Sequence, residues 1–229
     1  MSLTELTSGI ALVDLFLLFG ISIFGGFLFK RLKSGPRYLL GYLWLVTLVE
    51  SISKLYYFGY LQGSNLWLLH IYTLPEFVLL TLMYREYINL SPGKLKWFTR
   101  YLWGAAVLIG CYSVIHLLGA RPSRPEMFQL YSKTLVNGSV ISYASMLLIQ
   151  ALKSPSRFIN DFQGVMQINT GMLLYFTGSF VIFLTLRFSI GSELHKTVAL
   201  WFINALLTLL LHVICAFGLW TSDSKKATK

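Results

Sequence analysis

The stretch TVALWFINALLTLLLHVICAFGLW, residues 197–220, decides the fold class. It runs for 24 residues without an Asp, Glu, Lys or Arg. An α-helix needs about 20 largely apolar residues to cross the hydrocarbon core of a bilayer, so this stretch is long enough to span a membrane. Because lipid offers no hydrogen-bond partners to the backbone, a helix is the conformation expected for it.

Six further stretches share this length and apolar character. They are residues 9–29, 38–60, 65–84, 98–118, 127–151 and 165–186. Together with 197–220 they predict an all-α protein, an integral membrane bundle of seven transmembrane helices. No connection is long enough for a separate soluble domain, so we expect residues 1–229 to form one membrane domain. The turn signals between helices are Gly35 with Pro36, Ser91 with Pro92, RPSRP at 121–125, and Ser154 with Pro155.

Composition and charge support the same interpretation. Of the 229 residues, 55% are hydrophobic and 12% are charged. A water-soluble domain of this size would have too few polar side chains to cover its surface. The net charge of +10 would suit a nucleic-acid-binding protein, but the basic residues lie between the apolar stretches, as topology signals do. We therefore expect the lipid bilayer, and not nucleic acid, as a partner.

Lysine and arginine residues are concentrated on one side of the predicted bundle. Thirteen of the 19 lie at helix ends that face one side, four face the other side, and two lie within spans. The side richer in positive charge is normally cytoplasmic. This predicts a multi-pass protein of the cell membrane, or of the inner membrane in a bacterium, with the N-terminus outside and the C-terminus cytoplasmic.

Ionisable residues within a membrane span cost several kcal/mol unless they face a partner or a wet cavity, so they are candidate functional residues. Residues 38–60 contain Glu50 and Lys54, which are four apart and share a helix face with Tyr57. The simplest interpretation is an ion pair within the helix, with no binding role. The alternative is that both side chains line a binding site.

The densest polar cluster lies in NLWLLHIYTLPEFVLLTLMY, residues 65–84. His70 falls in the outer part, and Glu76 falls near the membrane midplane with Tyr72 one turn away on the same face. Pro75 removes a backbone donor and can kink the helix, and a kink beside a buried carboxylate suits a cavity. Alternatively, Glu76 is held by Lys54 or Lys133 and serves only packing.

The later spans add further polar residues. Lys133 and Asn137 lie in 127–151, the most polar span, where the lysine could simply snorkel to the surface. Tyr175 lies in 165–186. In 197–220, Asn204 and Thr208 share one face and His212 follows; hydrogen bonds between helices explain these adequately. Small residues four apart indicate close-packing faces: Ser22 with Gly26, Ala106 with Gly110, and Gly138 with Ser142.

Placed in antiparallel helices, most of these groups fall in the outer half of the membrane. They predict an outward-facing pocket for a small polar or zwitterionic ligand. The predicted ligand-binding residues are Glu50, Lys54, His70, Tyr72, Glu76, Lys133, Asn137 and Asn204.

Several functions lack the residues they need. A retinal protein needs a lysine in the middle of the last helix, and here Lys196 stands only at its entrance. Metal-dependent membrane hydrolases carry paired histidines, but the four histidines show no HxxxH pair, and Cys111 and Cys215 show no ligand spacing. We expect no cofactor, no metal and no assigned catalytic residue. An enzyme using His70 and Glu76 stays open as the third choice.

The layout of a short outer N-terminus, seven spans and a cytoplasmic end resembles the membrane region of bacterial seven-helix sensor proteins, including those fused to histidine kinases. HIYTLPEF, residues 70–77, is similar to segments of small bacterial membrane proteins of this kind. The chain departs from the sensor kinases because no output domain follows Trp220. The resemblance implies a ligand-sensing, receptor-like protein acting through a separate cytoplasmic partner, for which the basic stretches 30–37 and 85–100 are candidate contacts. Those stretches also fit simple topology signals next to anionic lipid. The main rival is a small-solute transporter.

Overall fold

Seven α-helices make up the described part of the chain, as the apolar stretches predict. The computed structural model describes residues 3–62, 65–118, 125–154, 163–189 and 194–224. All seven helices are long and apolar enough to cross a membrane, which is the architecture of a multi-pass membrane protein. The helices are α1 (Leu3–Leu28), α2 (Ser34–Tyr57), α3 (Leu66–Tyr87), α4 (Pro92–Leu118), α5 (Pro125–Lys153), α7 (Gln163–Ser189) and α8 (Leu194–Ser224).

Prolines mark the starts of three helices. Pro92 and Pro125 are the first residues of α4 and α5, and Pro36 lies in the first turn of α2. A proline is tolerated there because the first N–H groups of a helix have no partner within it. The prediction that Gly35 and Pro36 form a turn is therefore wrong, since both already belong to α2. The turn signals at 121–125 and at Ser154 with Pro155 extend beyond the described residues.

The end of α2 shows how the chain leaves a helix. Gly59 adopts a φ of 77°, which glycine reaches without steric cost. Its N–H donates to the Tyr56 carbonyl (3.1 Å), and the Tyr60 N–H donates to the Leu55 carbonyl (3.0 Å). These two bonds satisfy carbonyl groups that the helix end would otherwise leave open.

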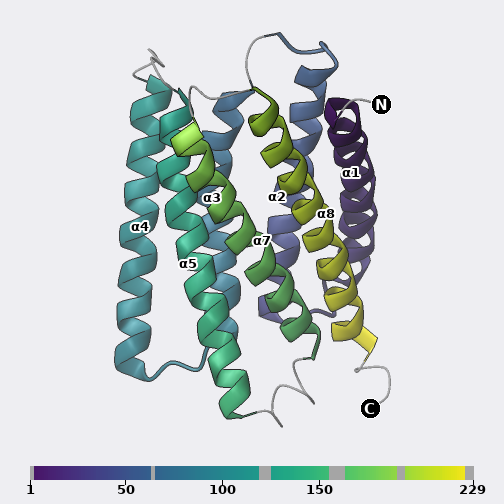
Figure 1. Ribbon diagram of the computed structural model, residues 1–229. Coiled ribbons are helices and arrows are strands. Elements are labelled where there is room, and N and C mark those ends of the chain that lie inside the picture. The colour runs from purple at the N-terminus through teal and green to yellow at the C-terminus, as the bar shows by residue number, and fades with distance from the viewer. Residues whose placement is uncertain (1–2, 63–64, 119–124, 155–162, 190–193, 225–229) are drawn as a thin grey trace.

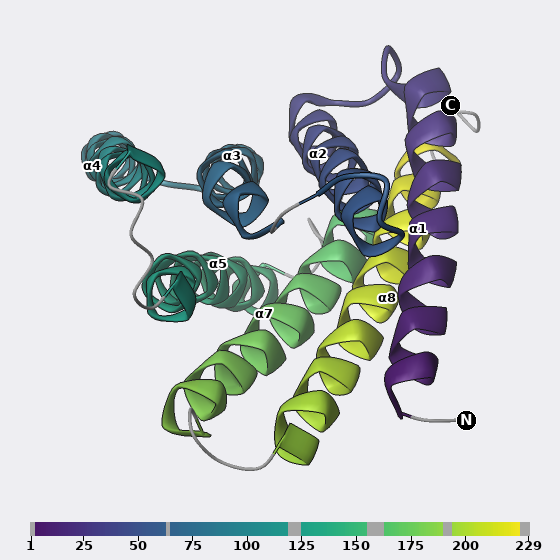
Figure 2. The ribbon, with the colours of Figure 1, turned by 90° about the horizontal axis from the view of Figure 1, so that it is seen from above.

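Six of the helices form a ring, and α4 lies outside it. Going around the ring, α1 packs against α2, α2 against α3, α3 against α5, α5 against α7, α7 against α8, and α8 back against α1. Figures 1 and 2 show this order, with α4 against the outer side of α3. Tyr101 of α4 also reaches α5, where its hydroxyl lies 2.7 Å from Ser139 Oγ. The interior of the ring therefore receives side chains from six helices.

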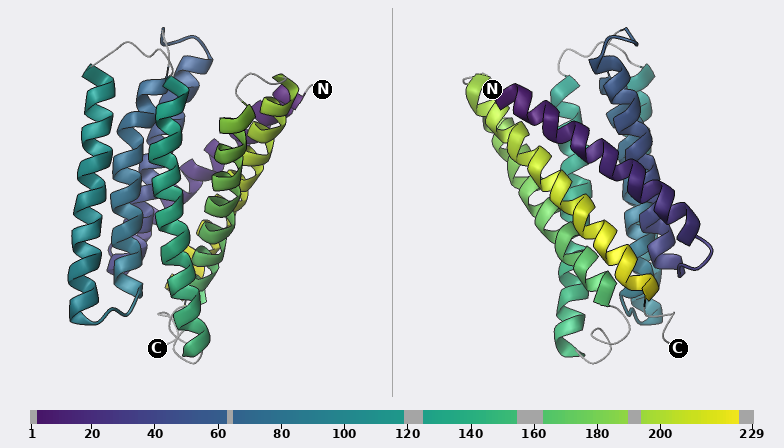
Figure 3. Two further views of the ribbon diagram at one scale, coloured as in Figure 1. Left: turned by 60° about the vertical axis from the view of Figure 1, so that its left-hand side comes forward. Right: turned by 90° about the vertical axis from the view of Figure 1, so that its right-hand side faces the viewer.

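The helices α1, α7 and α8 are tilted strongly relative to α3, α4 and α5 (Figure 3). Glycines allow α7 and α8 to approach closely. A Cβ atom added at Gly178 would lie 2.5 Å from Leu207 Cδ1, and one added at Gly218 would lie 2.8 Å from the Gly164 carbonyl oxygen. Small residues at such crossings bring two backbones together, which is how helices gain van der Waals contact in lipid.

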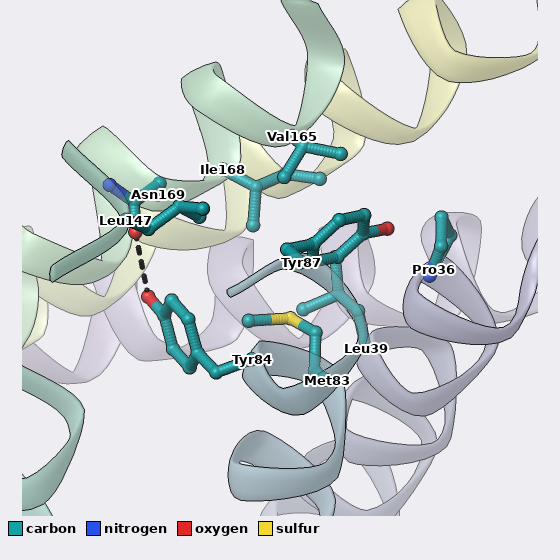
Figure 4. Close-up of a pocket in the computed structure, with 9 residues that line it drawn as sticks. All are labelled: Pro36, Leu39, Met83, Tyr84, Tyr87, Leu147, Val165, Ile168 and Asn169. Atoms are coloured by element: carbon teal, nitrogen blue, oxygen red, sulfur yellow. Dashed lines mark hydrogen bonds between the residues drawn. The ribbon is translucent and has the colours of Figure 1, made fainter. Parts of the chain in front are cut away.

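A small cavity lies between α2, α3, α5 and α7 (Figure 4). Its volume is about 10 Å³, close to the space one water molecule needs. Beside it, the Tyr84 hydroxyl of α3 donates to Asn169 Oδ1 of α7 (3.1 Å), and the Asn169 amide donates to the Ala144 carbonyl of α5 (3.1 Å). These bonds tie three helices together at this level.

Candidate functional site

Glu76 and Lys133 meet in the ring between α3 and α5. The Glu76 side chain is only 1% exposed, and its Oε2 atom forms an ion pair with Lys133 Nζ. The Tyr72 hydroxyl donates to Glu76 Oε1 (2.8 Å), and Lys133 Nζ lies 4.4 Å from the centre of the Tyr72 ring. Of the two partners predicted for Glu76, Lys133 is the one it has. The alternative that Lys133 snorkels to the surface is wrong, because a buried carboxylate attracts it inward.

Two more tyrosines surround this pair. Tyr42 of α2 and Tyr175 of α7 lie near enough to Glu76 to interact with its charge, and we call such residues electrostatic neighbours of Glu76. Tyr42 is also an electrostatic neighbour of Tyr72. The five residues come from α2, α3, α5 and α7, so the group joins four helices of the ring. We call it the central cluster: Tyr42, Tyr72, Glu76, Lys133 and Tyr175.

Asn137 adjoins the central cluster through Lys133, and Asn204 stands on the ring helix α8. Asn137 is buried one turn after Lys133, where its side-chain amide lies 3.2 Å from the Lys133 carbonyl and 3.3 Å from the Phe180 N–H of α7. Asn204 lies on α8, and its Oδ1 atom is buried without a hydrogen-bond partner in the part of the chain that the structure describes. A buried amide oxygen without a donor is unfavourable by about 1–3 kcal/mol, which makes Asn204 Oδ1 ready to accept a bond.

Glu50 and Lys54 do not form the predicted ion pair. Within the described residues, the half-buried Glu50 carboxylate has neither an ion-pair partner within 4 Å nor a hydrogen-bond donor. Lys54 Nζ instead lies over the Tyr57 ring, 5.4 Å from its centre. The two charges still attract each other at longer range. The ion pair does not form because Lys54 stands in the last turn of α2, where the Tyr57 ring competes with Glu50 for its ammonium group.

His70 stands six positions before Glu76, which places the two residues on different faces of α3. It is buried, and its backbone carbonyl accepts a hydrogen bond from Ser113 Oγ of α4 (3.1 Å). Pro75 does not interrupt α3, which stays helical from Leu66 to Tyr87.

A second buried group, which the sequence analysis missed, joins α1 to α8. Asp14 Oδ1 lies 2.7 Å from His212 Nδ1, and the two residues are 6% and 1% exposed. Glu50 of α2 is an electrostatic neighbour of both. We call Asp14, Glu50 and His212 the histidine cluster. Asp14 stands alone in the apolar run 9–29, so the rule that singled out Glu76 would have found it as well.

Tyr175 connects the two clusters. It is an electrostatic neighbour of Glu76 in the central cluster and of Glu50 in the histidine cluster, and its hydroxyl faces Thr208 of α8. Thr208 lies one helical turn after Asn204, and its Oγ1 atom donates to the Asn204 carbonyl (2.8 Å). Tyr175 is thus coupled electrostatically to both clusters.

Comparisons of the chain with protein-family models, curated proteins and solved structures give no significant match. A function for the polar residues inside the ring is therefore inferred from their positions and contacts.

Proposed function

We propose that this protein is a ligand-sensing membrane receptor that binds a small polar or zwitterionic molecule inside the helix ring. In this proposal the N-terminus is outside the cell and the signal passes to a separate cytoplasmic partner. The observation that carries it is Asn204 Oδ1, a buried acceptor without a donor among the described residues, together with the half-buried Glu50 carboxylate, which has no ion-pair partner at contact distance there. Acceptors of this kind are stabilised by a ligand that donates hydrogen bonds.

The charges favour a ligand that carries an ammonium group. Glu76 is already neutralised by Lys133, whereas Glu50 has no partner at contact distance among the described residues. An ammonium group on the ligand would pair with Glu50, and an anionic group on the same ligand would face Lys54. A zwitterion such as a small amino acid has this chemistry.

Thermal stabilisation of the purified protein tests the proposal. Amines, amino acids, carboxylates and neutral sugars are added separately in detergent. We expect the amine-bearing classes to raise the melting temperature of the wild type and of Glu5→Gln, a control outside the two clusters. We expect no such rise in Glu50→Gln. If no class stabilises the wild type more than Glu50→Gln, the binding proposal fails.

A second candidate, a small-solute transporter, is favoured by the electrostatic coupling of Tyr175 to both the central cluster and the histidine cluster. Uptake into proteoliposomes separates the two. A transporter moves the stabilising solute across the membrane, and a receptor binds it without flux.

A further inference from the structure

His212 is a buried base with one occupied and one unoccupied nitrogen. Its Nδ1 atom lies 2.7 Å from Asp14 Oδ1, which fixes the hydrogen on Nδ1, because a carboxylate accepts and the ring nitrogen must donate. The Nε2 atom is buried and has no hydrogen-bond partner within the described ranges. In this tautomer Nε2 carries a lone pair that can accept a hydrogen bond, and no described residue donates one to it.

The surroundings of His212 carry an unmatched negative charge. The titratable groups around it are Asp14 on α1, Glu50 and Lys54 on α2, and Tyr175 on α7, which neighbours Glu50. Cys215 follows one turn later on α8 and lies toward Tyr42 and Tyr84. With both carboxylates and the ammonium charged, Asp14, Glu50 and Lys54 leave one negative charge uncompensated. A positive charge on the imidazole ring would make the group neutral.

We propose that the histidine cluster is a proton-binding site in which His212 Nε2 accepts the proton. The proton comes from a hydronium ion, whose O–H bond breaks to leave water, and forms an N–H bond at Nε2, while the Nδ1–H group keeps its hydrogen bond to Asp14. Asp14 positions the ring, and Glu50 stabilises the imidazolium through space. Paired intramembrane groups of this kind form proton sites in membrane proteins. The inference shares Glu50 with the proposed ligand site but needs no ligand, because the proton binds at His212, outside the predicted ligand-binding residues.

Histidine-selective ¹⁵N NMR of the full-length wild-type protein in detergent tests the site directly. The ring nitrogens of neutral imidazole and of imidazolium have distinct chemical shifts, and the His212→Gln variant assigns the signal. We expect His212 to change from the Nδ1–H tautomer to imidazolium as the pH is lowered through about 9 to 4. A His212 signal that stays neutral over this range in folded protein overturns the proposal.

Two variants show whether the neighbours act as proposed. At the pH where half of the wild-type His212 is imidazolium, we expect Asp14→Asn to hold roughly tenfold less imidazolium, because an adjacent carboxylate favours the charged ring. Glu50→Gln should show a smaller decrease, since Glu50 acts without contact. Glu5→Gln, on α1 but outside the cluster, should match the wild type. Equal protonation in the wild type and Asp14→Asn would contradict the role of Asp14.

Discussion

The Glu76 carboxylate of α3 and the Lys133 ammonium of α5, 57 residues apart in the chain, form an ion pair inside the ring. Each side chain alone would place an uncompensated charge among apolar neighbours. Together, with the Tyr72 hydroxyl on the second carboxylate oxygen, they satisfy one another. The pair therefore sets which faces of α3 and α5 meet.

Removing one partner of this ion pair should lower the free energy of unfolding much more than removing both. We expect Glu76→Gln to lower the free energy of unfolding by about 3–5 kcal/mol, because Lys133 is left buried without a counter-charge. The double variant Glu76→Gln with Lys133→Met should recover most of that loss. Unfolding midpoints in detergent measure both effects, and Glu5→Gln is the control for the change of residue type. A double variant no more stable than the single one would contradict the pairing.

The Tyr72 hydroxyl should contribute more to the free energy of unfolding than a hydroxyl that is bound to a neutral partner. Tyr72→Phe removes a bond to a charged acceptor, for which we expect a loss of about 1.5–3 kcal/mol, while the ring over Lys133 is kept. Tyr101→Phe is the matched control, because its partner is the neutral Ser139 hydroxyl; there we expect about 0.5–1.5 kcal/mol. The same unfolding measurement compares them, and losses of equal size would show that Glu76 is not charged as described.

The crossing of α7 and α8 should be intolerant of one added methyl group. Gly218→Ala places a Cβ atom 2.8 Å from the Gly164 backbone oxygen, which cannot move aside as a side chain can. We expect a loss of about 1–3 kcal/mol from overpacking. Gly104→Ala in α4 meets nothing within 4 Å and should be neutral or stabilising by up to about 1 kcal/mol. Thermal melting ranks the two variants, and the reverse order would contradict the described crossing.

The proposed orientation is testable by labelling. Gln62 stands between α2 and α3, and Ser91 stands between α3 and α4. The α2–α3 connection lies at the end of the bundle near the N-terminus, and the α3–α4 connection lies at the opposite end (Figure 1). In a background with Cys111→Ala and Cys215→Ala, a membrane-impermeant maleimide should label Gln62→Cys in intact cells. It should label Ser91→Cys only after permeabilisation. The opposite pattern would reverse the assigned topology.

The seven helices are predictable because apolar length is a local property. All seven predicted stretches match described helices, and most differences lie at helix ends such as the proline-containing first turn of α2. The partner of Glu76 is not local. Lys54 and Lys133 fit equally well from the sequence, and only the packing of α3 against α5 decides between them.

The small-residue pattern shows the same limit. Ser22 does contact α2, where its Oγ lies 2.9 Å from Thr47 Oγ1. At Gly26 and Gly138, however, an added Cβ would meet nothing within 4 Å, whereas Gly25 closely faces Leu40. Spacing identifies small residues on a helix, but it does not tell which face lies toward lipid and which toward a neighbour.

The contact between Asp14 and His212 has a consequence for biogenesis. The two residues stand in the first and last described helices, 198 positions apart. Ribosomes add about 5–20 residues per second, so the aspartate waits roughly 10–40 s before its histidine has been synthesised. During that interval α1 carries an unpaired acid. The insertion machinery must therefore shield this helix, or the helix must stay near the bilayer surface, until α8 closes the ring.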